Sequence, residues 1–268
     1  MNQPPRISVV IPCFNHGEFL PEAVSSVISM HRDDVELIVV DDGSTDERTR
    51  KETAALTAQG IHVIRQENKG LSSARNTAVR ASRGEYIFPL DADDRIRPGC
   101  LDHAIRILDA DPKVSVVYGD VEFFGMRTGH WTSGPFDPHR LLRSNYIAAS
   151  ALFRRAVWEQ NGGYDERMLD GFEDWEFWIS ALEHGWKFVY VPEALFDYRQ
   201  ANESMLTRVR KLEEQAAQFI AVKHGALYRR AWLELANEHH SGKATLRNLH
   251  RIAKTRIKQK LRIDGDHG

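Results

Sequence analysis

Short β-branched runs alternate with segments of helical periodicity along the first 90 residues of the chain. Strands are expected at residues 7–11, 36–40, 61–65 and 85–90. Helices are expected between them, at residues 18–30, 47–59 and 72–82. This alternation predicts right-handed βαβ units on a parallel sheet. Such sheets bind ligands beyond the carboxyl ends of their strands, so residues that follow a strand are the first candidates for a functional site.

The rest of the chain predicts more α/β structure and then a helical tail. A helix at 100–110 and a strand at 114–118 precede an irregular segment, 119–145, which forms an antiparallel excursion or a loop over the site. The elements expected next are a strand at 147–153, helices from about 155 and near 174–184, and a strand at 187–191. Three helical stretches follow within residues 207–262. We therefore expect an α/β fold with a mostly parallel sheet flanked by helices, formed by residues 1–206, and a helical C-terminal appendage, residues 207–268.

The formal net charge of −2 hides an uneven distribution, because residues 1–206 carry −10 and residues 207–268 carry +8. An acidic body excludes a protein that binds nucleic acid over its whole surface. The basic extension predicts either a solvated helical appendage, packed on the acidic body or on a second copy, or a peripheral contact with anionic lipid. Acidic residues interspersed among the apolar ones around Trp232 favour the appendage or homodimer contact.

Cysteine content and hydropathy bear on the compartment. The chain has two cysteines, Cys13 and Cys100, which are too few for a disulfide framework and fit a reducing compartment. No apolar run approaches the roughly 18 residues of a membrane span. The sequence therefore predicts a cytoplasmic protein, and the lipid-binding alternative would place it on the inner face of a membrane.

Three carboxylates, Asp91, Asp93 and Asp94, follow the strand expected at residues 85–90. Two like charges about 4 Å apart repel each other by roughly 4 kcal/mol at an effective dielectric near 20, so protonation, arginines or a cation must offset them. Oxygen ligands suit Mg²⁺ or Mn²⁺, especially when a substrate diphosphate supplies further oxygens. Taken alone, the cluster equally allows a solvated turn that caps the next helix.

Asp41 and Asp42 stand at the end of the neighbouring strand. A short carboxylate there can accept hydrogen bonds from a ribose hydroxyl or a base N–H, although a pair of helix caps explains it as well. A nicotinamide-dinucleotide site is excluded, because residues 12–17 lack the glycine pattern that such a site requires.

Two helix starts add further candidates. Residues 68–76 combine a glycine turn, hydroxyls and Arg75, a composition that attracts anions but also suits ordinary capping. Glu173 and Asp174 begin an aromatic-rich helix with Trp175. Acids in such surroundings can gain proton affinity and act as a general base, whereas the alternative is first-turn acids on a helix whose tryptophans are core.

In their order and spacing these segments resemble the family 2 glycosyltransferases, the inverting nucleotide-sugar enzymes of the GT-A fold. The resemblance runs from residue 7 to about residue 207. It rests on the opening strand with Pro12 and Asn15 and on the segments 39–46, 68–76, 84–87, 90–94, 162–165 and 173–174. It implies a Rossmann-like GT-A domain in residues 1–206 that binds a nucleotide-sugar and catalyses its transfer.

The resemblance implies nucleotide-binding roles for Pro12, Asn15, Asp41, Asp42, Arg75 and Asp91. Within this set, Asp42 matches the base-recognising aspartate of the family, and Asp91 would face the ribose.

The resemblance also implies the groups that act on the diphosphate and the acceptor. Asp93, with Asp94, would hold Mn²⁺ or Mg²⁺ on the diphosphate, and Asp174 matches the proposed catalytic base. Glu173 and Trp175 are acceptor-side candidates. The sequence departs from the family at Ala201, where many members carry a histidine near the metal, so the third protein ligand is open.

The implied activity is metal-dependent, inverting transfer of a sugar from a nucleotide-diphosphate donor, expected to be a UDP-sugar, to a hydroxyl of a sugar or lipid-linked sugar. This activity would serve polysaccharide or glycoconjugate synthesis. The enzyme would be non-processive, because Trp175 lacks the Q-x-x-R-W context of processive relatives. Side chains from residues 119–145 and 172–178 are expected to select the acceptor. The alternatives are an idle nucleotide-sugar-binding scaffold, suggested by Ala201, and a sugar nucleotidyltransferase, which would need a glycine-rich phosphate loop where residues 13–17 lie.

Overall fold

The computed structural model describes the backbone of residues 4–200 and 206–240, and the side chains of residues 4–200 and 211–237. The chain forms two compact units, Met1–Lys223 and His224–Gly268. The domain division expected after residue 206 stays a prediction.

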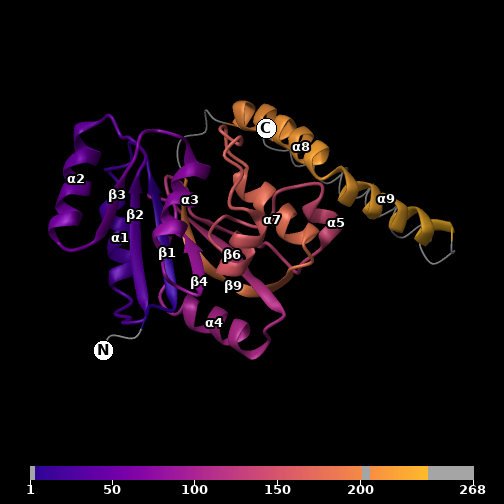
Figure 1. Cartoon of the computed structure of the whole chain (residues 1–268), viewed down its shortest axis with the longest axis horizontal. Helices are drawn as coiled ribbons and strands as arrows, with labels where there is room; N and C mark the ends of the chain where they lie inside the picture. The colour runs from indigo at the N-terminus through magenta and orange to yellow at the C-terminus, as the bar shows by residue number, and fades with distance from the viewer. Residues whose placement is uncertain (1–3, 201–205, 241–268) are drawn as a thin grey trace, which may run out of the picture. The chain divides into compact units, whose positions relative to one another are not determined.

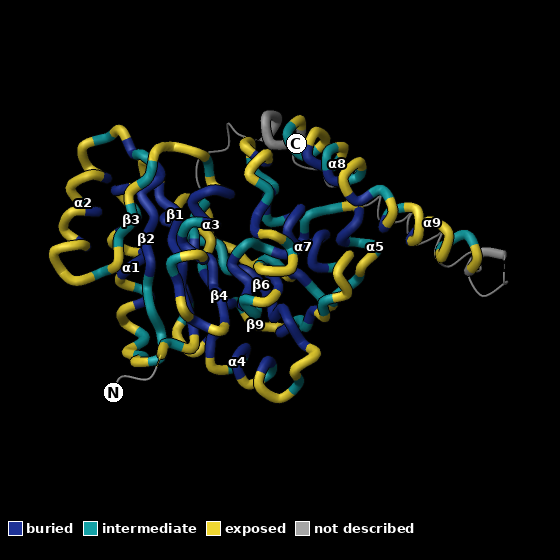
Figure 2. Tube along the Cα trace, viewed as in Figure 1, coloured by how far each residue is buried: buried dark blue, intermediate teal, exposed yellow. Residues whose placement is uncertain are grey.

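The N-terminal half of the first unit confirms the expected α/β alternation. Its elements are β1 (Ile7–Cys13), α1 (Leu20–Ile28), β2 (Val35–Asp41), α2 (Glu47–Ala58), β3 (His62–Arg65), α3 (Leu71–Ala81) and β4 (Tyr86–Pro89). β1 lies in the middle and pairs in parallel with β2 and β4, and β2 pairs in parallel with β3 (Figure 1). Every residue of β1 and β4 is buried, whereas α2 is mainly exposed (Figure 2). Runs that are apolar on both faces therefore became central strands.

The second half turns the sheet into a mixed one. Its elements are β5 (Arg95–Ile96), α4 (Cys100–Ala110), β6 (Val114–Gly125), β7 (Gly129–Trp131), α5 (Pro138–Leu141), β8 (Leu152–Arg154), α6 (Arg155–Asn161), α7 (Glu173–Glu183) and β9 (Lys187–Gln200). The strand order is β3-β2-β1-β4-β8-β6-β9-β5, and β7 pairs with β6 outside this path. β8 is antiparallel to both β4 and β6, whereas β6 and β9 are parallel.

β6 and β9 run well past the ends expected for them at residues 118 and 191. Their pairing is irregular beside Gly119, where the register shifts, and both strands continue beyond this point. A Cβ atom at Gly119 would lie 2.2 Å from the Glu193 carbonyl oxygen, so only glycine lets the two strands approach here. Glycine and proline, which indicate strand ends in a sequence, here occupy a bulge that continues both strands.

Helices cover the sheet on both faces. α1 buries Leu20, Ala23, Val24 and Val27, which lie on one helical face and join the core cluster that also contains the buried side of α4. α3 packs against β1 and β2, and α4 packs against β6 and β9. This packing fixes the strand ends from which the candidate site is built.

Two of the three expected C-terminal helices fall within the described residues. They are α8 (Leu206–Lys223) and α9 (Gly225–His240). The third expected stretch, toward residue 262, lies outside the residues that the structure describes. In residues 4–200 and 206–240, no helix combines the length and hydropathy needed to cross a bilayer.

Candidate functional site

The acidic residues singled out in the sequence lie at neighbouring strand ends. Asp41 is the last residue of β2 and Asp42 follows it. Asp91, Asp93 and Asp94 lie just beyond the end of β4, which is the second neighbour of β2 across β1. The structure therefore brings both acidic segments to the carboxyl edge of the parallel strands, where α/β sheets bind ligands.

Asp42 is buried and fixes the segment between β3 and α3. Its carboxylate accepts hydrogen bonds from the Gln66 side chain (2.7 Å) and from the backbone N–H groups of Lys69 (3.0 Å) and Gly70 (2.9 Å). Gly43 permits this approach, because it has a φ of +73° and a Cβ atom there would lie 2.6 Å from the Asn68 nitrogen. Two carboxylate oxygens offer about four acceptor directions, and these three hydrogen bonds use three of them. Contact of Asp42 with a nucleotide base stays a prediction.

Asp41 and Asn15 hold the turn that leads from β2 into α2. Asp41 accepts from the Ser44 N–H (2.8 Å) and from the Arg65 guanidinium (2.9 Å). The Asn15 side-chain oxygen accepts from the N–H groups of Thr45 (2.8 Å) and Asp46 (3.2 Å). Pro12 is buried within β1. These contacts support the loop around the predicted nucleotide site, and direct contact of the three residues with a nucleotide stays a prediction.

Arg75 lies in the interior, only 1% exposed. Its guanidinium donates to Asp91 Oδ1 (2.6 Å) and to Glu173 Oε1, and lies 5.6 Å from the centre of the Tyr164 ring. Burial opposes its charge, but Asp91 and Glu173 outweigh this effect and raise the pKa of Arg75. Arg75 therefore joins β4 to α7 through two acids, a role that the sequence did not reveal.

Asp93 and Asp94, in the acidic turn after β4, have different surroundings. Asp94 is 1% exposed and accepts from the Arg199 N–H of β9 (2.9 Å). Asp93 is more accessible, and its Oδ1 lies 3.9 Å from His16 Nδ1. Burial, and next the charge of Asp91, raises the pKa of both Asp93 and Asp94. The surroundings of Asp93 and Asp94 thus disfavour their ionised forms, a cost that a nearby positive charge would reduce.

The donor set fits a magnesium- or manganese-type ion only in part. Oxygen ligands of this kind suit such ions, which commonly take one or two carboxylates and complete their shell with water and substrate phosphates. Among the described residues, no group of three or more His, Cys, Asp or Glu side chains is arranged to hold a metal. Ala201, the position of the family histidine, lies outside those residues.

Asp174 lies at the start of α7, behind a strained turn. Phe172 has a φ of +62°, which is unfavourable for a residue with a side chain and is typical of functional sites. Asp174 accepts from both the Trp175 N–H (2.7 Å) and the Asn145 side-chain amide (3.0 and 3.1 Å). Burial, and next the charge of Glu173, raises the pKa of Asp174 to about 7. A carboxylate with that pKa suits a general base at neutral pH.

One cavity of about 550 Å³ brings part of these groups together, whereas the others do not line it: Pro12, Asn15, Asp41, Asp42 and Asp93. Its acidic wall carries Asp91, Asp94, Glu173 and Asp174 beside Arg75. Its apolar wall is formed largely by residues from the segments beyond the β6–β9 bulge and from β7: Val121, Phe123, Trp131, Phe196 and Tyr198. Carboxylates and aromatic faces thus meet in one space, which suits a polar ligand with flat apolar surfaces such as a sugar.

Trp175 is not among the residues that line this cavity, and the acceptor-side role expected for it stays a prediction. It is 1% exposed, and its indole N–H donates to the Leu141 carbonyl oxygen (2.7 Å). Glu173 does line the cavity, but it is buried and paired with Arg75.

The sequence missed Asn145 and most of the apolar wall as individual residues. It did indicate their segments, because Val121, Phe123, Trp131 and Asn145 belong to residues 119–145, expected near the acceptor. Tyr198 and Phe196 had no such signal, since β9 was expected to end before them.

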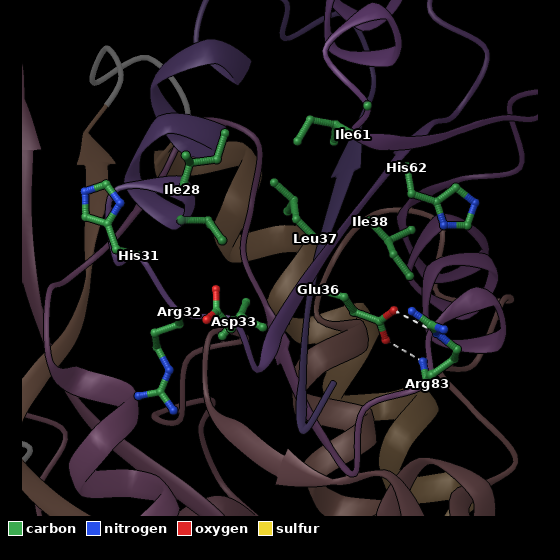
Figure 3. A pocket seen from close by; sticks show the side chains of 13 residues that line it. Ile28, His31, Arg32, Asp33, Glu36, Leu37, Ile38, Ile61, His62 and Arg83 are labelled. Atoms are coloured by element: carbon green, nitrogen blue, oxygen red, sulfur yellow. Dashed lines mark hydrogen bonds and ion pairs between the residues drawn. The ribbon is translucent and has the colours of Figure 1, made fainter. Parts of the chain in front are cut away.

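A second cavity, of about 460 Å³, lies at the opposite ends of the strands. Figure 3 shows Ile28, Leu37 and Ile61 on one side and Glu36 turned toward Arg83 on the other. Glu36 also accepts from the Ser8 hydroxyl (2.6 Å) and the Gly84 N–H (3.0 Å). Its carboxylate is therefore committed to the fold, and none of the predicted site residues lines this cavity.

Comparison with known proteins identifies one family. The model of the family "Glycosyl transferase family 2" matches residues 8–164. A chondroitin synthase from Escherichia coli is 26% identical over 230 residues, which cover 84% of this chain and 33% of that protein. The uncharacterized glycosyltransferase EpsJ from Bacillus subtilis is 27% identical over 223 residues, 76% of this chain and 64% of that protein. The chain thus spans a third of the first relative and under two thirds of the second.

Solved structures share the fold. The crystal structure of residues 1–349 of S. aureus TarS in complex with UDP-GlcNAc superposes with a TM-score of 0.66 and 20% identity, covering 81% of this chain and 66% of that one. The same protein in complex with UDP gives a TM-score of 0.60 at 22% identity, covering 79% of this chain and 65% of that one. At these identities the likeness concerns the fold.

Proposed function

Because this chain belongs to glycosyl transferase family 2, we propose that it transfers a sugar from a UDP-sugar to an acceptor hydroxyl with inversion at the anomeric carbon. The structural neighbour TarS was crystallised with UDP and with UDP-GlcNAc, which supports a uridine donor. The acceptor we propose is a sugar or a lipid-linked sugar, extended by one unit at a time in polysaccharide or glycoconjugate synthesis.

One observation carries this proposal: Asp174 shares a single cavity with Asp91, and Arg75 bonds both Asp91 and Glu173, the neighbour of Asp174. In the proposed reaction, Asp42 and Asp91 orient the nucleotide, and Arg75 keeps Asp91 and Glu173 in place. Asp174 removes the proton from the acceptor hydroxyl, whose oxygen then attacks the anomeric carbon from the side opposite the diphosphate. Attack from that side inverts the configuration, and only one protein base is needed.

We propose that Asp93, assisted by Asp94, holds Mn²⁺ or Mg²⁺. Such an ion, when bound, neutralises the negative charge that develops on a departing diphosphate. The raised pKa of Asp93 supports this assignment, because the carboxylate lies where a positive charge would relieve an existing electrostatic cost.

The experiment that tests this function is ligand-induced thermal stabilisation followed by turnover. We expect UDP-GlcNAc with Mn²⁺ to raise the melting temperature of the full chain, because a ligand that binds only the folded state stabilises it. Asp93→Asn should remove most of the Mn²⁺-dependent part of this shift, whereas Asp111→Asn, a change in a half-buried acid outside the site, should keep it.

Other outcomes separate the alternatives. Stabilisation without UDP release over a broad acceptor panel would favour the idle scaffold. Release of pyrophosphate from UTP and a sugar phosphate would favour the nucleotidyltransferase. Equal Mn²⁺-dependent shifts in the wild type and Asp93→Asn would contradict the proposed metal ligand.

The sequence favours an appendage or homodimer contact for the C-terminal extension, but the exposure of its apolar residues leads us to propose the alternative, a peripheral contact with anionic lipid, where a lipid-linked acceptor would be available. Trp232 and Leu233 of α9 are 71% and 60% exposed, and Arg229 and Arg230 beside them are exposed as well. The following residues, 241–268, add eight Lys and Arg against two Asp. An exposed tryptophan beside basic residues is typical of a membrane-surface segment.

The location of the protein in the cytoplasm stays a prediction.

Vesicle sedimentation checks this contact. We expect the full chain to sediment with vesicles that contain phosphatidylglycerol and not with pure phosphatidylcholine, and added salt should release it. Trp232→Ala should weaken sedimentation severalfold. Concentration-dependent dimerisation without vesicle binding would instead support a homodimer contact.

A further inference from the structure

Asn145 contacts the cavity acid from a segment 29 residues away along the chain. Its side-chain Nδ2 donates to Asp174 Oδ1 (3.0 Å) and Oδ2 (3.1 Å). Its Oδ1 is buried and has no hydrogen-bond partner among the described residues. We propose that Asn145 is a positioning residue of the transfer reaction, whose amide holds the Asp174 carboxylate ionised and correctly oriented. This inference rests on the proposed role of Asp174 as the base.

An asparagine that only supports the fold uses its whole amide. Asn76 is an example in the same chain: its Oδ1 accepts from the Tyr164 N–H (2.8 Å) and the Trp158 indole (2.9 Å), and its Nδ2 donates to the Tyr164 carbonyl (2.9 Å) and to Glu166 (3.0 Å). Asn145 differs, because within the described part of the chain its side chain hydrogen-bonds Asp174 alone. Only one end of the Asn145 amide is thus bound by protein groups of the described residues, and that end faces the carboxylate of Asp174.

The direction of the Asn145 amide matches an ionised carboxylate. An N–H pair facing two carboxylate oxygens is favourable, whereas the amide oxygen in that place would need a protonated acid. The charged and titratable groups around Asp174 are Glu173 beside it, Arg75 on α3, Tyr164 after α6 and Tyr198 on β9. Arg75 is already committed to Asp91 and Glu173. Asn145 and the Trp175 N–H are therefore the groups that hydrogen-bond the Asp174 charge itself.

Proton transfer gives this contact its function. The acceptor O–H bond breaks, the proton forms an O–H bond on Asp174, and the acceptor oxygen uses its electron pair to bond the anomeric carbon. The nucleoside diphosphate leaves with the electron pair of the bond it had to the sugar. Asn145 keeps Asp174 free of a proton before this step and keeps its oxygens directed at one place.

Unfolding free energy tests the proposal without a donor. The measured quantity is the unfolding free energy of the wild type minus that of Asp174→Asn. This difference should fall as the pH rises and become constant above the folded-state pKa of Asp174; we call the pH at which it becomes constant the levelling pH. In an Asn145→Ala background, the same comparison should level off about one pH unit higher, because the ionised acid loses its hydrogen bond. Asn145→Asp should raise the levelling point further, since two carboxylates in contact share a proton.

A matched control is Asn161→Ala. Asn161 also contacts α7, through a hydrogen bond from its Nδ2 to the Phe177 carbonyl (3.0 Å), and does not touch Asp174. It should lower stability without moving the levelling pH. The acid limb of the pH–rate profile for UDP-GlcNAc turnover should show the same ranking, with about a tenfold loss for Asn145→Ala well below the pKa.

The possible results separate this inference from the proposed function. An unchanged levelling pH in Asn145→Ala, with transfer lost in Asp174→Asn, would overturn the Asn145 inference and leave the base in place. Wild-type transfer in Asp174→Asn would overturn the base assignment and this inference with it. An upward shift in both measurements, absent in Asn161→Ala, would support it.

Discussion

Asp174→Asn is expected to abolish sugar transfer and, at pH 8, to make the protein more stable. Removing a general base costs roughly 10²–10⁴-fold in rate. The change keeps the size of the side chain and its capacity to accept from the Trp175 N–H. Turnover of UDP-GlcNAc by the variant, with Mn²⁺ present, measures the first effect.

The gain in stability follows from the sign of the pKa shift. Burial raises the folded-state pKa of Asp174 to about 7, above the value of about 3.9 expected for an unfolded chain. The ionised carboxylate therefore destabilises the folded state, fully above the folded pKa and not at all below the unfolded one. Three pKa units correspond to about 4 kcal/mol, which is an upper bound for the gain at pH 8. The unfolding midpoint of Asp174→Asn should therefore lie above that of the wild type at pH 8, and the two midpoints should be nearly equal at pH 4.

Asp111→Asn provides a control of opposite sign. Asp111 is a half-buried acid bonded to Lys187, and that hydrogen bond lowers the pKa of Asp111. Its removal should cost a little stability and leave turnover unchanged. A variant Asp174→Asn that turns over within tenfold of the wild type would contradict the assignment of Asp174 as base.

Local patterns explain why the acidic half of the site could be predicted. β-branched runs locate the parallel strands, and the residues after each run must lie at one edge of the sheet. Asp42 directly follows β2 and Asp91 is the second residue after β4, so both positions agree with that rule. No knowledge of the tertiary contacts was needed for this step.

The other half depends on pairs distant in the sequence. Arg75 meets Glu173 across 98 residues, and Asn145 meets Asp174 across 29, so neither pair leaves a local pattern. The apolar wall required β6 and β9 to continue past Gly119, a residue that normally ends a strand. The Glu193 carbonyl oxygen of the partner strand lies so close to Gly119 that a side chain there would clash, and this approach depends on the three-dimensional pairing of the two strands.

Arg75→Met is expected to destabilise the protein by about 3–5 kcal/mol at pH 8, the range seen when one partner of a buried ion pair is removed. The change leaves Glu173 only 3% exposed without its cation, while Glu173 Oε2 already has no hydrogen-bond partner among the described residues. An isolated buried carboxylate binds a proton more readily. The loss should therefore be smaller at pH 5 than at pH 8, as unfolding in urea at the two pH values would show.

A second substitution separates the structural from the functional part of Arg75. Arg75→Met with Glu173→Gln removes both charges, and replacing a buried pair by neutral groups is often nearly neutral for stability. We expect the double variant to recover most of the stability of the wild type. The extra loss of stability at pH 8 that we expect for Arg75→Met should also disappear. Asp91 would still lack the contact that orients it, so stabilisation by UDP-GlcNAc should stay weak. Recovery of both would mean that Arg75 only balances charge, whereas recovery of stability alone would mean that it places Asp91 for the nucleotide.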